Sequence, residues 1–242
     1  MKASGPLHRI RVVLSRPSHP GNIGAAARAM KTMGIAQLVL VRPKRFPAPE
    51  ARAMASGALD LLGSARVCED LDEALAGTAF SVALSARPRE LSHRVLGARE
   101  AARELVGAAR GSEVAVVFGN ETVGLTNEEV MSCSRLARIP ASEGYASLNL
   151  AQAVQVMAYE IRMAALAPAV PEEAPDPAPH EDLERLYAHM ERSLAASGFL
   201  HPRDPRKLME RLRRLFARAG LDKAEVSILR GMLAAWDRPR RE

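Results

Sequence analysis

Short β-branched runs alternate with amphipathic stretches of helical spacing over the first two thirds of the chain. The runs predict strands at residues 10–14, 37–41, 66–68, 80–84, 114–118 and 136–139. The stretches between and after them predict helices at residues 22–33, 51–62, 71–75, 99–108, 126–133 and 147–165. Because helices that alternate with strands pack on both faces of a shared sheet, this pattern predicts an α/β fold with a mostly parallel sheet.

The pattern ends in a segment that we interpret as a linker between two domains. The sequence LAPAVPEEAPDPAPH contains five prolines and three acidic residues but no basic residue. Proline-rich segments of this kind are extended and semi-rigid. We therefore expect a first domain at 1–166, a linker at 167–180 and a second domain at 181–242.

The second domain is expected to be small and entirely helical. Its first apolar stripe consists of Leu183, Leu186, Tyr187, Met190 and Leu194. Asp204 can cap a second helix that begins at Pro205, and residues 221–236 predict a third helix. On the second helix, the residues expected to face inward are Leu208, Leu212, Leu215 and Phe216. We interpret Trp236 as a core residue in preference to a platform for stacking bases.

Cations recur on the second of these helices. Lys207, Arg211, Arg214 and Arg218 follow one another at spacings of 4, 3 and 4 residues, so they share one face. That face is either solvated surface or a track for RNA phosphates. We favour the track, because aligned cations repel one another unless an anion lies along them. The net charge of +6 and the sequence pI of about 9.8 agree with a polyanionic partner.

The composition narrows the class of protein further. Hydrophobic residues make up 48% of the chain, which is ample for a core. Cys68 and Cys133 lack metal-ligand spacing and are expected to be buried thiols, and the histidines are scattered, so we expect no metal site. No run approaches the roughly 20 apolar residues of a membrane span, and MKASGPLHRIRVV does not read as a leader peptide. We therefore expect a cytoplasmic protein.

Glycines and small polar residues follow several of the predicted strands, where an open α/β sheet binds ligands. In HPGNIGAAARAM, Asn22 can cap a helix whose first backbone N–H groups could hold an anion, and Arg28 lies two turns further on. In ALSARPRELSH, small residues precede Arg87 and Arg89, whose guanidinium groups suit phosphate. The glycine spacing does not fit a dinucleotide-binding loop.

Two further segments predict a ligand site at the same edge of the sheet. In VFGNETVGLT, a β-branched run ends in Gly119 and is followed by Glu121 and Gly124. In SLNLAQAV, Ser147 is expected to cap a helix. Motifs for a covalent nucleophile are missing, so an enzyme built on these loops would position two substrates and stabilise charge.

Taken in order, these segments resemble a known family. NIGAAARAM, SARPR, VFGNETVGLTNEE, RIPAS and YASLNLAQAVQVMAYEIRMA follow the motifs of the SPOUT superfamily of RNA methyltransferases. They are most similar to the TrmJ family of tRNA 2′-O-methyltransferases. The helical tail from Gly198 to Arg238 is similar to the small C-terminal domain of that family, so the resemblance covers nearly the whole chain.

The resemblance implies a parallel α/β fold with a deep trefoil knot, followed by the small helical domain. It implies S-adenosylmethionine as methyl donor, S-adenosylhomocysteine as product, and a homodimer whose active sites are each completed by the partner subunit. The cofactor-binding residues would be Leu84, Ser85, Ala86, Gly119, Glu121, Ile139, Ala146, Ser147 and Leu148. It implies no metal ion.

The resemblance also implies roles in the reaction. Arg28 and Ser147 would be catalytic: Arg28 orients the ribose hydroxyl and the adjacent phosphate, and Ser147 hydrogen-bonds near the reacting oxygen. Asn149 would support the cofactor loop. The residues expected to contact RNA are Asn22, Arg87, Arg89, Lys207, Arg211, Arg214 and Arg218.

The expected reaction is 2′-O-methylation of cytidine or uridine at position 32, in the anticodon loop of tRNA. Two alternatives stay open: ribosomal RNA methylation by a SpoU-class enzyme, and a non-catalytic RNA-binding protein. The chain departs from the family at Asn120, where arginine is frequent, so one phosphate contact is expected to be lost or supplied elsewhere.

Overall fold

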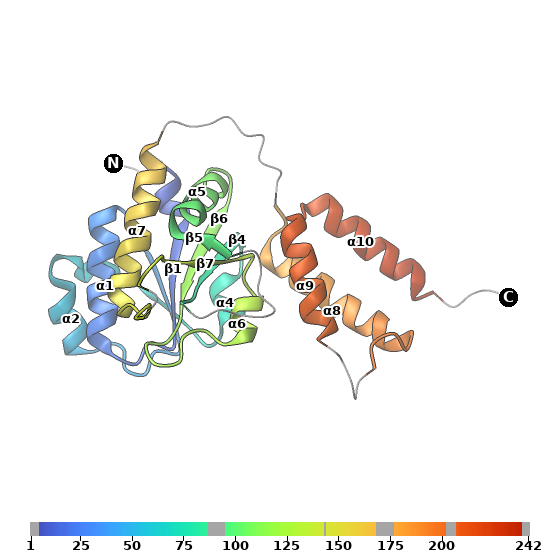
Figure 1. The fold of residues 1–242 in the computed structure, drawn as a ribbon, viewed down its shortest axis with the longest axis horizontal. Helices are drawn as coiled ribbons and strands as arrows, with labels where there is room; N and C mark the ends of the chain where they lie inside the picture. The colour runs from blue at the N-terminus through green and yellow to red at the C-terminus, as the bar shows by residue number, and fades with distance from the viewer. Residues whose placement is uncertain (1–4, 87–94, 143, 168–176, 202–206, 239–242) are drawn as a thin grey trace.

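The computed structural model describes residues 5–86, 95–142, 144–167, 177–201 and 207–238. An α/β body occupies the first two thirds of the chain, and a separate group of helices follows it (Figure 1). Arg87, Arg89, Asp204 and Pro205, to which the sequence assigned roles, lie outside the described residues.

The described part of the body contains a seven-stranded sheet in the order β3-β2-β1-β6-β4-β7-β5, and every pair of neighbouring strands is parallel. The strands are β1 (Ile10–Ser15), β2 (Gln37–Val41), β3 (Arg66–Cys68), β4 (Thr78–Leu84), β5 (Val95–Gly97), β6 (Glu113–Phe118) and β7 (Arg135–Arg138). The predicted parallel α/β fold is confirmed. All strands therefore end at one edge of the sheet, which is where the loops singled out in the sequence meet.

Helices cover both faces of this sheet. The helical segments are η1 (Pro6–Arg9), α1 (Pro20–Met33), α2 (Pro49–Ala55), η2 (Ser56–Ala58), α3 (Leu59–Gly63), α4 (Leu71–Leu75), α5 (Ala98–Ala108), α6 (Asn127–Met131) and α7 (Leu150–Leu166). Buried residues of α1, α2, α5 and α7 pack on one face, and those of α4 and α6 pack on the other. Successive strand residues point to opposite faces, so Val116 joins the first cluster and Val117 the second.

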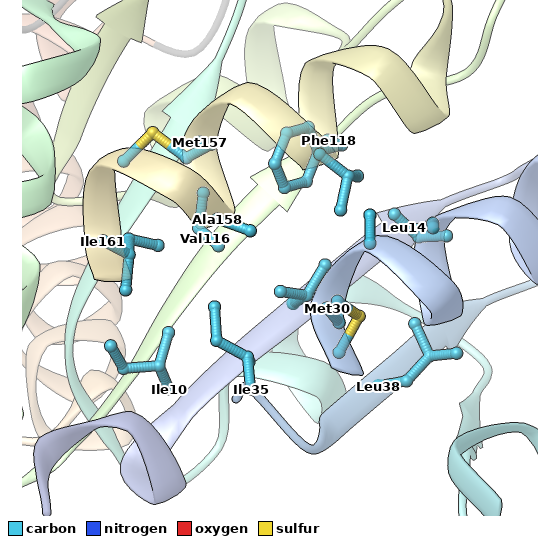
Figure 2. Packing of buried hydrophobic residues seen from close by; sticks show 14 of the residues in the cluster. Ile10, Leu14, Met30, Ile35, Leu38, Val116, Phe118, Met157, Ala158 and Ile161 are labelled. Atoms are coloured by element: carbon cyan, nitrogen blue, oxygen red, sulfur yellow. The ribbon is translucent and has the colours of Figure 1, made fainter. Parts of the chain in front are cut away.

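The larger cluster shows why the core needs few aromatic rings. In Figure 2, Met30 of α1 and Met157 and Ile161 of α7 lie over the strand residues Ile10 and Val116. Ile10, Met30, Val116, Met157 and Ile161 are all fully buried. Branched aliphatic and flexible thioether side chains thus fill the space between α1, α7 and the sheet.

The structure corrects several local predictions. The helix expected at 51–62 is broken into α2, η2 and α3, and Ser56 at the break has a φ of 50°. Strand β5, Val95–Gly97, was not predicted from the sequence. Helix α6 lies within the segment 126–133 predicted to be helical, and it begins with a capping box formed by Thr126 and Glu129.

The second domain is formed by α8 (His180–Ala196), α9 (Leu208–Ala219) and α10 (Lys223–Trp236). Its buried core comprises Ala178, Leu186, Tyr187, Met190, Leu221, Val226 and Leu233. Ala178 belongs to this core and its N–H donates to Leu221 O (3.0 Å), so the last residues of the expected linker are part of the domain. The expectation that Trp236 is a core residue is wrong, since it is 75% exposed, and Leu215 is also exposed.

Helices α8 and α9 lie beside the body, as Figure 1 shows. A guanidinium N–H of Arg135, in β7, donates to the carbonyl of Ala217, in α9. The backbone N–H of Gly77, just before β4, donates to Glu181 in α8 at 3.0 Å. These bonds hold the second domain against the β4–β7 side of the body.

Gly24 tests the packing of α1 on α2. A Cβ atom added at Gly24 would overlap the backbone carbonyl of Ala51, whereas one added at Gly21 would meet only Met54 Cγ at 3.6 Å. We expect Gly24→Ala to lower the free energy of unfolding by about 1–3 kcal/mol through overpacking, measured by urea denaturation. Gly21→Ala, on the same helix, is the control and should not destabilise; equal stability of the two variants would contradict the packing described.

Candidate active site

One cavity lies at the carboxyl ends of β4, β6 and β7, with a volume of about 240 Å³. Every residue to which the sequence assigned the cofactor lines it: Leu84, Ser85, Ala86, Gly119, Glu121, Ile139, Ala146, Ser147 and Leu148. They come from three loops that are far apart in the sequence. The structure thus brings the expected cofactor residues together around one space, and their binding role stays a prediction.

The loop after β6 is shaped by its own contacts. A Cβ at Gly119 would overlap the backbone of Gly124 and Leu125, so glycine is needed there for the loop to close on itself. Gly119 thus has a structural role within the loop that the sequence predicted to bind a ligand. Asn120 Oδ1 accepts from the N–H groups of Thr122 (2.9 Å) and Val123 (3.2 Å).

Asn120 also connects this loop to the end of β1. Its Nδ2 donates to the carbonyl of Arg16 at 2.8 Å. The asparagine therefore builds the loop with both ends of its amide, at the position where the family resemblance had suggested an arginine.

Glu121 has the densest set of hydrogen bonds at the site. Its carboxylate accepts from the N–H and hydroxyl of Ser18 (both 2.8 Å), from the N–H of His19 (3.1 Å) and from Asn22 Nδ2 (2.9 Å). Partial burial by itself raises the pKa of Glu121, but the hydrogen bonds from Asn22 and Ser18 outweigh it and lower the pKa to about 2. The anion expected at the start of α1 is thus the protein's own carboxylate.

Asn22 and Asn149 extend this network to α7. Asn22 lies within α1 and does not cap it, which corrects the sequence prediction. Asn22 Oδ1 accepts from Asn149 Nδ2 at 3.0 Å. Asn149, and not Ser147, is the N-cap of α7: its Oδ1 accepts from the N–H groups of Ala151 (2.9 Å) and Gln152 (3.4 Å). Ser147 lies in the approach to the helix and lines the cavity.

Arg28 is not part of this cavity. It is exposed on α1, six residues after Asn22, which corresponds to about 9 Å along the helix. It does not line the cavity and makes no side-chain hydrogen bond or ion pair within the described residues. The structure of one chain therefore places Ser147 at this cavity but does not bring Arg28 to it.

The cations of α9 are available to a partner. Lys207, Arg211 and Arg218 are exposed and Arg214 is half-buried. Arg213, which the sequence did not single out, has a different role. It forms an ion pair with Glu184 through bonds of 2.5 and 2.6 Å, and its guanidinium carbon lies 4.4 Å from the centre of the Tyr187 ring.

A metal site and a cysteine nucleophile find little support in the described part of the chain. No group of His, Cys, Asp and Glu side chains there could hold a metal ion. Burial raises the pKa of the Cys133 thiol to about 12 and also raises that of Cys68, so neither is an activated nucleophile. Both thiols are buried, as predicted. No described helix has the length and apolar character needed to cross a membrane.

Comparisons with known proteins place both parts of the chain. Residues 9–159 match the SpoU rRNA Methylase family, and residues 181–242 match the C-terminal domain of the tRNA methyltransferase TrmJ. The tRNA (cytidine/uridine-2′-O-)-methyltransferase TrmJ of Klebsiella pneumoniae is 50% identical over 95% of this chain and 96% of its own length. The tRNA (cytidine/uridine/adenosine-2′-O-)-methyltransferase TrmJ of Pseudomonas aeruginosa is 49% identical over 94% of this chain and 93% of its own.

A solved structure agrees with these matches. The crystal structure of TrmJ from Z. mobilis superposes with a TM-score of 0.83 at 33% identity, covering 94% of this chain and 99% of that one. The similarity therefore extends over both domains and not over the α/β body alone.

Glu121 gives a test of the hydrogen-bond network. We expect Glu121→Gln to lower the free energy of unfolding at pH 7 by about 1–2 kcal/mol after allowance for solvent screening, because an amide accepts weaker bonds than a carboxylate. The folded pKa of about 2 lies below the ordinary 4.5. The stabilisation is thus present above about pH 4.5 and is lost as the pH falls towards 2.

Urea unfolding at a series of pH values measures this effect. The difference between the parent and Glu121→Gln should be constant above about pH 5 and shrink towards zero near pH 2. Glu191→Gln, an exposed glutamate of α8, is the control and should show little difference at any pH. A parent–variant difference at Glu121 that does not change with pH would exclude the charged carboxylate as its cause.

Proposed function

The chain belongs to the SpoU rRNA Methylase family, and on that premise we propose that it transfers a methyl group from S-adenosylmethionine to a ribose 2′-hydroxyl of tRNA. The observation that carries the proposal is the full-length similarity to TrmJ proteins, including the second domain. That domain favours tRNA over ribosomal RNA, because it is the part that matches TrmJ and adds a cationic helix.

We place the reaction at position 32 of the anticodon loop, on cytidine or uridine. This position is the role expected of the TrmJ family. Adenosine is a further candidate, since the Pseudomonas aeruginosa relative is named for all three nucleosides. A non-catalytic role is disfavoured because Arg28, Glu121, Ser147 and Asn149 are all present.

The cavity fits the proposed cofactor. Leu84, Ile139 and Leu148 supply apolar surface that suits an adenine ring, and small residues on the same wall let a ligand approach the backbone. The carboxylate of Glu121 is held by hydrogen bonds from Ser18 and Asn22 and keeps its negative charge. When bound, S-adenosylmethionine supplies an electrophilic methyl group on a sulfonium.

The residues of the chain would then position the ribose and manage its charge. The attacking hydroxyl must lose a proton, and Arg28 is not the base, because a guanidinium group is not deprotonated in proteins. Arg28 orients the hydroxyl and the neighbouring phosphate, and that phosphate or a water accepts the proton. Ser147, at the cavity wall, hydrogen-bonds near the reacting oxygen.

A homodimer would bring the two parts of the site together. Arg28 lies away from the cavity of its own chain, so a second subunit can supply it to the cavity. Helix α7 presents an exposed apolar stripe that a partner could cover: Tyr159 (49%), Met163 (44%) and Leu166 (62%). The trefoil knot implied by the family resemblance stays a prediction that agrees with the strand order.

Methyl transfer from tritiated S-adenosylmethionine tests the proposed function. Unmodified tRNA should be labelled at the ribose of nucleotide 32, as located by mass spectrometry, and ribosomal RNA should not. Label only in ribosomal RNA would replace the tRNA proposal with the SpoU-class alternative. Absence of label from every RNA would leave only the non-catalytic reading.

Arg28 should be indispensable in this assay. We expect Arg28→Ala and Arg28→Lys each to lower kcat by about 100-fold or more. Alanine removes the guanidinium group, and lysine cannot make its bidentate contact. Binding of S-adenosylhomocysteine, measured by calorimetry, should be unchanged, since the proposed partners of Arg28 are the ribose and its phosphate and not the cofactor. If Arg28→Lys retained the parent rate while Arg28→Ala did not, any role that depends on guanidinium geometry would be excluded.

The cationic face of α9 should contribute to tRNA affinity without affecting the chemistry. We expect the double substitution Arg211→Gln and Arg218→Gln to weaken tRNA binding and to reduce the slope of log K against log salt by about 1.4–1.8. Arg185→Gln is the control, because Arg185 is already paired with Asp182. An unchanged salt slope in the double variant would show that α9 is only a solvated surface.

A further inference from the structure

Tyr145 has no role in the site as described so far, yet it is the most exposed of the large hydrophobic side chains within the described residues. Its side chain is 79% exposed. It stands immediately before Ala146, Ser147 and Leu148, which line the cofactor cavity. An aromatic ring in open solvent at the rim of a ligand cavity suggests a surface that is covered when the substrate binds.

The backbone on both sides of Tyr145 is held in place. Tyr145 pairs with Ser142 in an antiparallel bridge, and its N–H donates to Ser142 O at 3.1 Å. On the other side, Asn149 caps α7 and is bonded to Asn22. Tyr145 and Ser147 are two residues apart, so their Cα atoms lie within about 7 Å of each other. The backbone at Tyr145 is therefore held in place two residues from Ser147, the residue proposed to hydrogen-bond near the reacting oxygen.

We propose that the ring of Tyr145 stacks on the base of the nucleotide whose ribose is methylated, an inference that rests on the proposed function. Unstacked bases of single-stranded RNA loops are commonly held on aromatic side chains. The base is attached directly to the ribose, so a base stacked on Tyr145 would keep its 2′-hydroxyl close to Ser147. Tyr145 is then a residue that binds and positions the substrate.

Stacking also fits the expected range of bases. Every base has an aromatic face, so stacking tolerates changes of base identity, whereas hydrogen bonds to base edges do not. Relatives about half identical to this chain are named for cytidine and uridine, and one is named for adenosine as well. The other strongly exposed aromatic residues, Phe199 and Trp236, belong to the second domain and do not line the cavity.

Substitutions at Tyr145 test the proposal. Tyr145→Ala should lower kcat/KM for tRNA by roughly 10- to 100-fold, the loss typical of one base–aromatic stack. Tyr145→Phe keeps the ring and should stay within about threefold of the parent, while Tyr145→Leu should resemble Tyr145→Ala. The affinity for S-adenosylhomocysteine should be unchanged in all three. Phe199→Ala, an equally exposed aromatic residue elsewhere, is the matched control and should keep full activity.

A fluorescent base gives a direct readout of stacking. Fluorescence of 2-aminopurine at the target position should be quenched by the parent and by Tyr145→Phe but not by Tyr145→Ala. Full activity of Tyr145→Ala, in an assay where the parent methylates tRNA, would overturn the proposal. So would loss of S-adenosylhomocysteine binding, or dissociation of a dimer seen by light scattering, because Tyr145 would then shape the cofactor loop or a subunit interface. An inactive parent would instead refute the proposed function.

Discussion

The carboxylate of Glu121 connects the segments on which the site depends. It accepts hydrogen bonds from Ser18, His19 and Asn22, and so joins the loop after β6 to the first turn of α1. Asn22 passes the connection to Asn149 at the start of α7. A displaced side chain at this position would leave the backbone N–H groups of Ser18 and His19, just before α1, without this acceptor, which is costly where water is partly excluded.

This network also determines which residue caps α7. Because Asn149 accepts the first N–H groups of the helix, Ser147 is released from capping and lies in the cavity wall. A cap two residues earlier would have used the hydroxyl that the proposed reaction needs. The two polar residues of the segment SLN therefore have different roles. Ser147 lines the cavity, and Asn149 caps the helix that follows.

The spacing of apolar residues and the capping residues were enough to predict the sheet and most of its helices. The strands β1, β2 and β6, for example, are runs rich in β-branched residues bounded by glycine or polar residues. They failed where tertiary contacts decide. Ser147 and Asn149 are both good caps in isolation, and only the bond from Asn149 to Asn22, 127 positions away, selects between them. Trp236 lies on an apolar stripe of α10 that stays exposed among the described residues.

For the candidate site, too, part could be predicted from the sequence and part could not. Loops that follow neighbouring parallel strands must meet, so the cofactor residues could be grouped from the sequence once the strands were placed. Arg28 obeys no such rule, because a residue two turns into α1 need not face the carboxyl edge of its own sheet. Its exposure and the exposed apolar stripe of α7 are the two observations that the proposed homodimer would account for, with a second subunit completing the site.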